Sequence, residues 1–340
     1  MSSRNPTDER GRIRVSGFDA ESLDRRGELF DWTPDRADRA TSRRARAWRR
    51  FKRNRTALVG LAIIALMAFV AVFARPIDVA GVTVQPVALA PYDPGASNFD
   101  ALNQPPSLAH PFGTDWAGKD VLSRVMYGGR FSLSIGVIAV SLALLIGVPL
   151  GAVAGYFGGW VDEAIMRLVD VLYAFPFLVL AIALIAVLGQ GFWKIILAIV
   201  LVSWISYARL VRGEILSVKE NEYVLAAKAL GARDRSIIFR HIVPNAIAPV
   251  IVQATLGIGT IVLTAAALGF LGLGLEPGTA EWGSMLSNGR ETLVQGQWWI
   301  TVFPGLAIFL FVLSINLVGD GVRDAIDPQG DLGEGAEEVR

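Results

Sequence analysis

The stretch FSLSIGVIAVSLALLIGVPLGAVAGYF, residues 131–157, carries no charged side chain along its whole length. About 20 mainly apolar residues are enough for a helix to cross the roughly 30 Å of hydrocarbon in a bilayer. This stretch is longer than that, so it predicts a membrane-spanning helix. The whole chain agrees with this interpretation. Hydrophobic residues make up 53% of the sequence and charged residues only 19%, with a mean hydropathy of +0.46, which is more apolar than an ordinary soluble domain.

Five further apolar runs lie on either side of this stretch. The first, residues 56–74, follows a leader that is too long for the n-region of a signal peptide, so we expect an uncleaved helix. The others are residues 171–188, 195–208, 244–275 and 298–318. Six spans predict an all-α, multi-pass membrane protein. The run from residue 244 is longer than one span needs, and glycines favour a break in it: Gly257, Gly259, Gly269, Gly272 and Gly274.

Charge decides the predicted orientation of these spans. Residues 43–55 (RRARAWRRFKRNR) are strongly basic without an acid, and residues 209–241 form a second basic segment. Basic segments stay on the cytoplasmic side, and six spans place both of these there, together with both termini. We therefore expect these regions: a cytoplasmic, largely disordered tail 1–55, a first helix 56–74, an extracytoplasmic loop 75–130, a five-helix core 131–320 and an acidic cytoplasmic tail 321–340.

The sequence shows no candidate catalytic, cofactor-binding or metal-binding residues. Cysteine is absent, and the two histidines, His110 and His241, have no neighbouring ligand cluster. Residues 113–120 match a P-loop except that Asp120 replaces the Ser or Thr that holds magnesium. No apolar strand precedes this match, so we interpret it as a false positive and expect no enzyme activity in this chain. Ion-coupled transport is also disfavoured, because the spans contain essentially no ionisable side chain.

Small residues recur at every fourth position along the second predicted span. Such a ridge lets a second helix backbone approach closely. It therefore predicts a packing surface, either within the chain or toward a partner subunit. The residues are Gly147, Gly151, Gly155 and Gly159.

The segment 212–243 is the most distinctive cytoplasmic part of the chain. Residues 220–230 favour a helix, and Gly231 is a natural stop. Asp234 is suited to cap a second short helix through Arg240, before Pro244 opens the next span. Two short helices joined at a glycine predict a compact knob that fits a cleft in another protein. The alternative is an ordinary amphipathic loop that packs on its own bundle.

The spacing Ala226-Ala227-x3-Gly231-x12-Pro244 resembles the EAA loop of binding-protein-dependent ABC importer permeases, with Leu225 where that family has a glutamate. The resemblance implies a short coupling helix that docks into an ATPase subunit. The residues that it assigns to this contact and its frame are Glu222, Leu225, Ala226, Ala227, Leu230, Gly231, Ala232 and Pro244.

Three further segments extend the resemblance to residues 51–328. HPFGTD with DVLSR (residues 110–124), FLGLGL with EWG (270–283) and NLVGDGVRDAIDP (316–328) are similar to the C-type permease subunit of dipeptide, oligopeptide and nickel importers. This implies the type I importer (MetI-like) fold. Loop residues expected on the side of a solute-binding protein are Asp115, Asp120, Arg124, Trp282 and Arg290.

The resemblance also implies the biological context. The chain is expected to be a permease in the cell membrane that forms half of a path for short peptides. A second permease, two ATPases that use ATP and magnesium, a solute-binding protein and the lipid bilayer are the expected partners, and nucleic acid is not. Nickel or another small solute is the alternative cargo, and a carrier that works alone is the alternative mechanism.

Overall fold

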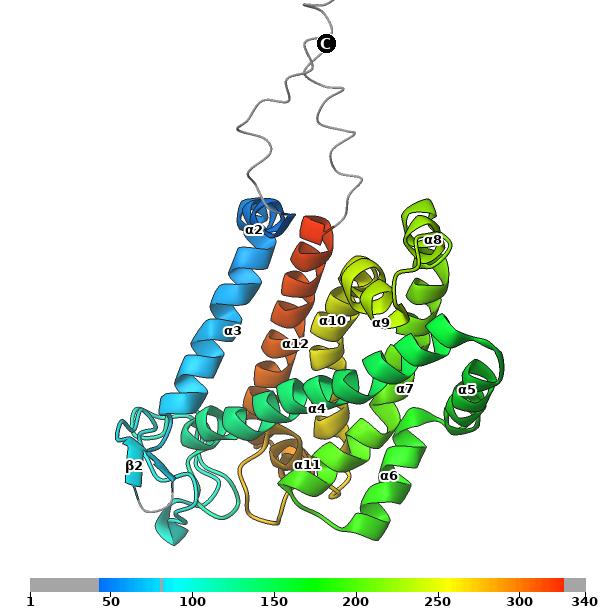
Figure 1. Ribbon diagram of the computed structural model, residues 1–340. Coiled ribbons are helices and arrows are strands. Elements are labelled where there is room, and N and C mark those ends of the chain that lie inside the picture. Colours follow the sequence, from blue (N-terminus) through cyan, green and yellow to red (C-terminus); the bar gives the residue numbers. More distant parts are fainter. Residues whose placement is uncertain (1–42, 80–81, 327–340) are drawn as a thin grey trace, which may run out of the picture. The chain divides into compact units, whose positions relative to one another are not determined.

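The computed structural model describes residues 43–79 and 82–326, and Figure 1 shows the arrangement of its helices. The described part contains five helices that are long and apolar enough to cross a membrane, and a sixth span exists if one bent helix pair is counted. The predicted class, an all-α multi-pass membrane protein, is therefore confirmed, with five spans, or six if the bent pair is counted. The cytoplasmic placement of the termini stays a prediction, and most of the two predicted tails (residues 1–42 and 327–340) lies outside the described residues. The five helices are α3 (Arg55–Phe73), α4 (Val121–Phe157), α7 (Phe192–Val218), α10 (Val243–Phe270), whose span begins at Asp234, and α12 (Trp299–Ile326).

Three helices begin at a side chain that caps their first turn. Asn54 accepts a hydrogen bond from the Ala57 N–H at the start of α3, and Asp120 accepts one from the Ser123 N–H at the start of α4. Glu281 does the same for α11 (Trp282–Leu293), a shorter helix between α10 and α12. Such caps satisfy N–H groups that a helix leaves without a partner. The three caps therefore fix the residue at which each helix begins.

The glycine ridge of α4 packs against α7 of the same chain. A Cβ atom on Gly147 would lie 2.6 Å from the Trp204 carbonyl oxygen, and one on Gly155 would lie 2.9 Å from that of Arg212. The backbones of the two helices are thus in direct contact, as small residues allow in membrane helices. Gly159 has no neighbour within 4 Å and lies beyond the end of α4, so it is not part of this surface.

The third predicted span is not one straight helix. The chain forms α5 (Gly159–Tyr173) and α6 (Phe177–Leu188), which meet at an angle of 86°. Pro176 explains the break, because the residue before a proline is disfavoured in the helical region. The 12 residues of α6 rise about 18 Å, well short of the bilayer core. The expected continuous span 171–188 is therefore corrected to a bent pair.

The break expected within residues 244–275 falls only near the end of this run, at Gly272 and Gly274. The helix α10 continues through Gly257, Gly259 and Gly269 and ends at Phe270, while Gly272, with φ of +77°, follows in the next turn. Gly259 and Gly269 instead allow neighbouring elements to pack closely against α10. A Cβ atom on Gly259 would lie 2.7 Å from Ile315 of α12, and the Cβ of Gly269 would meet the Glu281 carboxylate at 2.5 Å. The irregular part precedes the helix, in α9 (Asp234–Ser236) and a π-helical segment η3 (Ile237–Ile242).

The remaining elements flank these helices. Basic residues form α2 (Arg43–Arg53) ahead of α3, and Phe51 of α2 packs with Ala57, Val318 and Ala325 at the ends of α3 and α12. Between α3 and α4, β1 (Ile77–Val79) pairs antiparallel with β2 (Val82–Gln85), followed by the 3-10 turn η2 (Phe99–Ala101). This loop and α11 lie at one end of the bundle, and α8 (Glu222–Ala229) lies at the other (Figure 1).

Candidate functional site

The segment between α7 and α10 folds into one short, well-defined helix, α8. It ends at Gly231, whose φ of +76° is in the left-handed region that favours glycine. The Gly231 N–H donates to the Lys228 carbonyl at 3.0 Å, and the Ala232 N–H donates to that of Ala227 at 3.1 Å. These two bonds form a Schellman motif. The predicted helix and its glycine stop are therefore present in the structure.

A single apolar anchor holds α8 on the bundle. Val224 is 3% exposed and packs in a cluster with Val211 and Ile215 of α7 and with Ile237 and Ile242 of η3. The rest of the helix is largely open to its surroundings. Burial of one aliphatic side chain fixes the orientation of α8, and it leaves the other face free for contact.

The exposed surface of α8 carries several apolar side chains beside the charged Glu222 and Lys228. Leu225 is 53% exposed and Leu230 is 88% exposed, and Tyr223 and Ala226 are also exposed. Tyr223, Ala226 and Leu230 share one side of the helix by their spacing, and Leu225 lies on another side. Leu225 thus places an exposed apolar side chain where the EAA pattern has a glutamate, and exposed large apolar side chains are typical of a site of interaction. Of the other residues assigned to this contact, Glu222 is exposed, Ala227 and Ala232 are half-buried, and Pro244 lies apart in the first turn of α10.

Polar contacts tie the base of this loop to neighbouring helices. The Lys219 ammonium group donates to the Gly155 carbonyl of α4 at 2.9 Å. The Arg212 guanidinium donates through Nε and Nη2 to both oxygens of Asp162 on α5, each at 2.5 Å, a bidentate pair of the strong type. The end of α7 that leads to α8 is therefore bonded directly to α4 and α5.

Asp234 does not have the predicted role. The N-cap position of the following helix is Arg233, and the Asp234 carboxylate instead accepts a hydrogen bond from the Tyr156 hydroxyl at 2.5 Å. The second helix also does not stop at Arg240, because it runs on through η3 into α10. The knob is thus one short helix and the extended start of a span, not two separate short helices.

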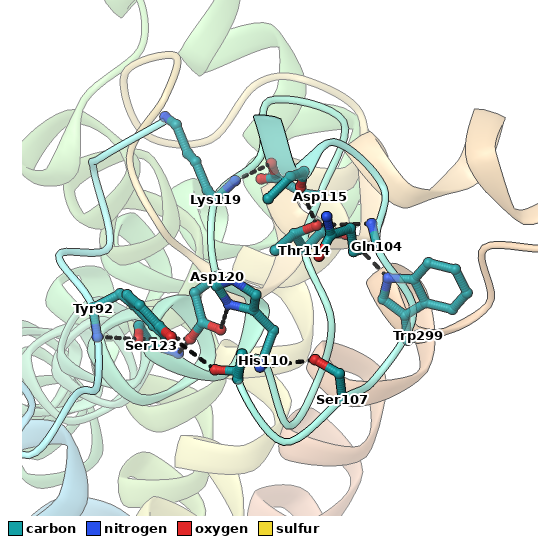
Figure 2. Close-up of polar contacts among 12 residues, drawn as sticks. Tyr92, Gln104, Ser107, His110, Thr114, Asp115, Lys119, Asp120, Ser123 and Trp299 are labelled. Atoms are coloured by element: carbon teal, nitrogen blue, oxygen red, sulfur yellow. Dashed lines mark hydrogen bonds and ion pairs between the residues drawn. The ribbon is translucent and has the colours of Figure 1, made fainter. Parts of the chain in front are cut away.

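At the other end of the bundle, a buried polar cluster organises the loop before α4 (Figure 2). The Asp120 carboxylate lies 2.9 Å from His110 Nδ1 and accepts hydrogen bonds from the Ser123 N–H and hydroxyl at 2.8 and 2.7 Å. The Thr114 carbonyl accepts a hydrogen bond from Trp299 Nε1 at 3.0 Å. Asp120 therefore joins the loop to the start of α4, and Thr114 joins it to α12.

Asp115 and Arg124 complete this interior. Asp115 Oδ2 lies 3.7 Å from Arg124 Nε, and its Oδ1 accepts hydrogen bonds from the N–H groups of Ala117 and Lys119. Arg124 also donates to the Pro94 carbonyl at 3.1 Å. The segment that matches a P-loop in sequence is thus a turn closed around its own aspartate.

A second buried carboxylate lies at the start of α11. Glu281 is 1% exposed and accepts hydrogen bonds from the N–H groups of Gly283 and Ser284 at 2.8 and 2.9 Å. Burial nevertheless raises the pKa of the Glu281 carboxyl, and the hydrogen bonds oppose this only in part. The adjacent Trp282 is buried as well, and its indole N–H donates to the Val125 carbonyl at 2.9 Å.

These positions correct the expected contact with a binding protein. Asp115, Asp120, Arg124 and Trp282 are all buried, and each has a partner within the chain. They hold the loop in shape, and only Arg290 on α11 is exposed. Sequence reasoning missed three large apolar side chains that are exposed in this loop beside its polar residues: Phe99, Leu108 and Trp116.

Comparisons with known proteins agree with this architecture. Residues 147–329 match the family described as binding-protein-dependent transport system inner membrane component, and residues 42–106 match the N-terminal TM domain of oligopeptide transport permease C. A dipeptide transport system permease protein of Alkalihalophilus pseudofirmus is 44% identical over 283 residues, which are 83% of this chain and 89% of that protein. A glutathione transport system permease protein of Escherichia coli is 46% identical over 285 residues, with the same coverage of 83% and 89%.

Among solved structures, an inward-facing MetNI methionine ABC transporter chain aligns with a TM-score of 0.49 and 20% identity. The alignment covers 60% of this chain and 96% of that chain.

Proposed function

Because this chain belongs to the family of binding-protein-dependent transport system inner membrane components, and is a C-type permease of an ABC importer, we propose that it passes short peptides across the cytoplasmic membrane. A second, related permease completes the path, and an extracytoplasmic solute-binding protein delivers the peptide. Two ATPase subunits supply the energy. Support for the cargo comes from the curated relatives, which are named as dipeptide and glutathione permeases, since glutathione is itself a short peptide.

The exposed apolar side chains of α8 are the observation that carries the coupling part of this proposal. Leu225 and Leu230 are more than half exposed on a helix whose orientation is fixed by Val224. An exposed apolar surface at one end of a membrane bundle suits a soluble partner. We assign this surface to the ATPase subunit.

The contacts beneath α8 support a rigid transmission of force. Lys219 and Arg212 bond the α7 end to α4 and α5, and Tyr156 bonds the end of α4 to Asp234. When the ATPases close on ATP, they pull α8, and the end of α7 moves with it together with the helices α4 and α5 that are bonded to that end. Such rigid-body rotation of packed helices is a common form of switching.

The test is co-purification of the ATPase from a membrane extract that contains the complete complex. In the double variant Leu225→Arg and Leu230→Arg, the ATPase subunit is expected to be lost while the second permease is retained. Leu108→Arg is the matched control, because Leu108 is fully exposed at the opposite end of the bundle. Retention of the ATPase by the double variant overturns the docking assignment.

The peptide cargo has a separate test. The complex is reconstituted in proteoliposomes with its binding protein, and ATP-dependent uptake of dialanine and of glutathione is measured. Uptake of either supports the proposal. The proposal is overturned if the complex takes up neither dialanine nor glutathione although the loaded binding protein stimulates its ATPase.

A further inference from the structure

A cavity of about 530 Å³ lies between α7, α10 and the bend that joins α5 to α6. Its walls are mainly apolar and aromatic, with Phe175 and Pro176 contributed by the bend itself. Neutral polar side chains project into it from the two long helices. Ser206 and Tyr207 come from α7, and Gln253 and Thr260 come from α10.

The polar side chains lie on one face of each helix. Gln253, Gly257 and Thr260 are spaced four and three residues apart, which places them on one side of α10. At the middle position a Cβ atom would lie 2.3 Å from the Tyr207 hydroxyl. Gly257 thus makes the space in which the Tyr207 hydroxyl reaches α10, between Gln253 and Thr260.

This polar face is unsuited to lipid. Ser206, Gln253 and Thr260 are exposed in helices that cross the membrane. Within the residues that the structure describes, neither the Gln253 amide nor the Tyr207 hydroxyl makes a hydrogen bond. Unpaired polar groups are costly in hydrocarbon, and inside membrane proteins they face a bundle interior or a water-filled cavity. The cavity is therefore suited to a polar occupant.

Its lining carries no charged side chain. The charged groups nearest along the chain are Arg209 and Asp170, and these are 2.9 Å apart and pair with each other. Arg209 also lies over the Tyr173 ring at 4.3 Å. A ligand of this cavity is thus recognised through neutral hydrogen bonds and apolar contact, not through its charged ends.

We infer that this cavity binds the main chain of the transported peptide. The Gln253 amide both donates and accepts, as a peptide group does, so the two pair directly. The hydroxyls of Tyr207, Ser206 and Thr260 supply further donors and acceptors, and the apolar walls accept the peptide side chains. Recognition of the main chain suits a path for peptides of varied sequence. This inference rests on the proposed function, of which it names the contact residues.

Cysteine labelling tests the site directly, because the chain contains no cysteine. Gln253→Cys and Thr260→Cys are made singly in the complete complex, and a charged methanethiosulfonate reagent is applied in proteoliposomes. A mass shift of this subunit is expected, and dialanine with ATP and loaded binding protein is expected to slow it at least about 5-fold. Ile251→Cys is the matched control, because Ile251 is 43% exposed on another face of α10. Reactivity no higher than that of the control, or reactivity that dialanine leaves unchanged, overturns the inference.

Transport kinetics give the second measurement. Gln253→Leu and Tyr207→Phe each remove hydrogen-bonding capacity, and loss of one such bond is expected to raise the KM for dialanine about 5-fold. Ile251→Leu is expected to leave this KM unchanged. A wild-type complex that transports no peptide refutes the proposed function. A wild-type complex that transports dialanine, with unchanged KM in both variants, refutes only the assignment of the cavity.

Discussion

The Cβ atom that Gly151 of α4 lacks would lie 2.3 Å from the carbonyl oxygen of Ala208 on α7. No side chain fits in that space, so the two helices are in contact through their backbones. The same relation is repeated one turn away on each side, at Gly147 and Gly155. This contact joins α7, which leads to α8, with α4, which follows the loop that begins after α3.

Gly151→Ala is therefore expected to destabilise the protein, by about 1–3 kcal/mol for the displaced helices. The measurement is the thermal unfolding midpoint of the purified complex in detergent. Gly213→Ala on α7 is the matched control, because its Cβ meets nothing within 4 Å and alanine favours helix over glycine. An equal midpoint for the two variants would contradict backbone contact at Gly151.

Gly231→Ala is expected to weaken coupling between the ATPase and transport. A non-glycine residue at its φ of +76° costs about 1–2 kcal/mol, which loosens the end of α8. Peptide uptake per ATP hydrolysed is the quantity to measure.

The control for this variant is Gly272→Ala. Gly272 has φ of +77° and, like Gly231, no neighbour within 4 Å, but it follows α10 at the opposite end of the bundle. The two variants impose the same backbone strain. A similar fall in uptake per ATP in both would show that strain in general, not the shape of α8, limits coupling.

Asp120→Ala is expected to lower the unfolding midpoint, because it removes the partner of His110 and two hydrogen bonds to Ser123. The loss is about 2–3 kcal/mol for a buried carboxylate with several partners. Arg290→Ala is expected to leave the midpoint unchanged, since Arg290 is exposed. A binding-protein titration then separates the two residues. A lower affinity in Arg290→Ala with an unchanged midpoint would make Arg290 a contact residue.

Glu281 predicts a pH dependence of stability. Its pKa is raised by burial in the folded state, so the folded state binds a proton more tightly than the unfolded state. Protonation of Glu281 therefore contributes fully to the free energy of unfolding below the pKa that this carboxyl has in the unfolded chain. This contribution is lost as the pH rises through the pKa that it has in the folded protein. The neutral variant Glu281→Gln lacks this titration. The unfolding midpoint of the wild type minus that of Glu281→Gln is therefore expected to increase as pH falls from 8 toward 4.5, and a constant difference would contradict the raised pKa.

The sequence predicts the membrane spans well but not their ends. The second span begins at Val121 instead of residue 131, because Arg130 donates to the carbonyls of Ala71 and Val72 and so remains compatible with the helix. The fourth begins at Phe192 and continues to Val218, beyond the predicted limit at residue 208, because Arg209 and Arg212 pair with acids of α5. Hydropathy alone ends a helix at its first charge. Ion pairs between helices allow the helix to continue past that charge, and hydropathy does not detect such pairs.

The candidate sites also include parts that the local sequence predicts and parts that depend on contacts between distant residues. Gly231 and the helix before it follow from local chemistry, so sequence reasoning found them. The buried bond between Trp299 and Thr114 joins residues 185 positions apart, and the cavity brings Tyr207 to Gly257. Neither contact can be predicted from a pattern of neighbouring residues in the sequence. Sequence reasoning therefore treated the buried loop acids as contact residues and missed the polar face of α10.

The bend between α5 and α6 has a consequence for solvation of the backbone. The first turn of α6 begins beside Pro176 at the cavity, and its N–H groups have no partner within the helix. Lipid does not satisfy such groups. Water or another polar group at the cavity can accept these hydrogen bonds. The bend thus places the cavity beside Pro176, where α6 starts without a capping side chain among the described residues.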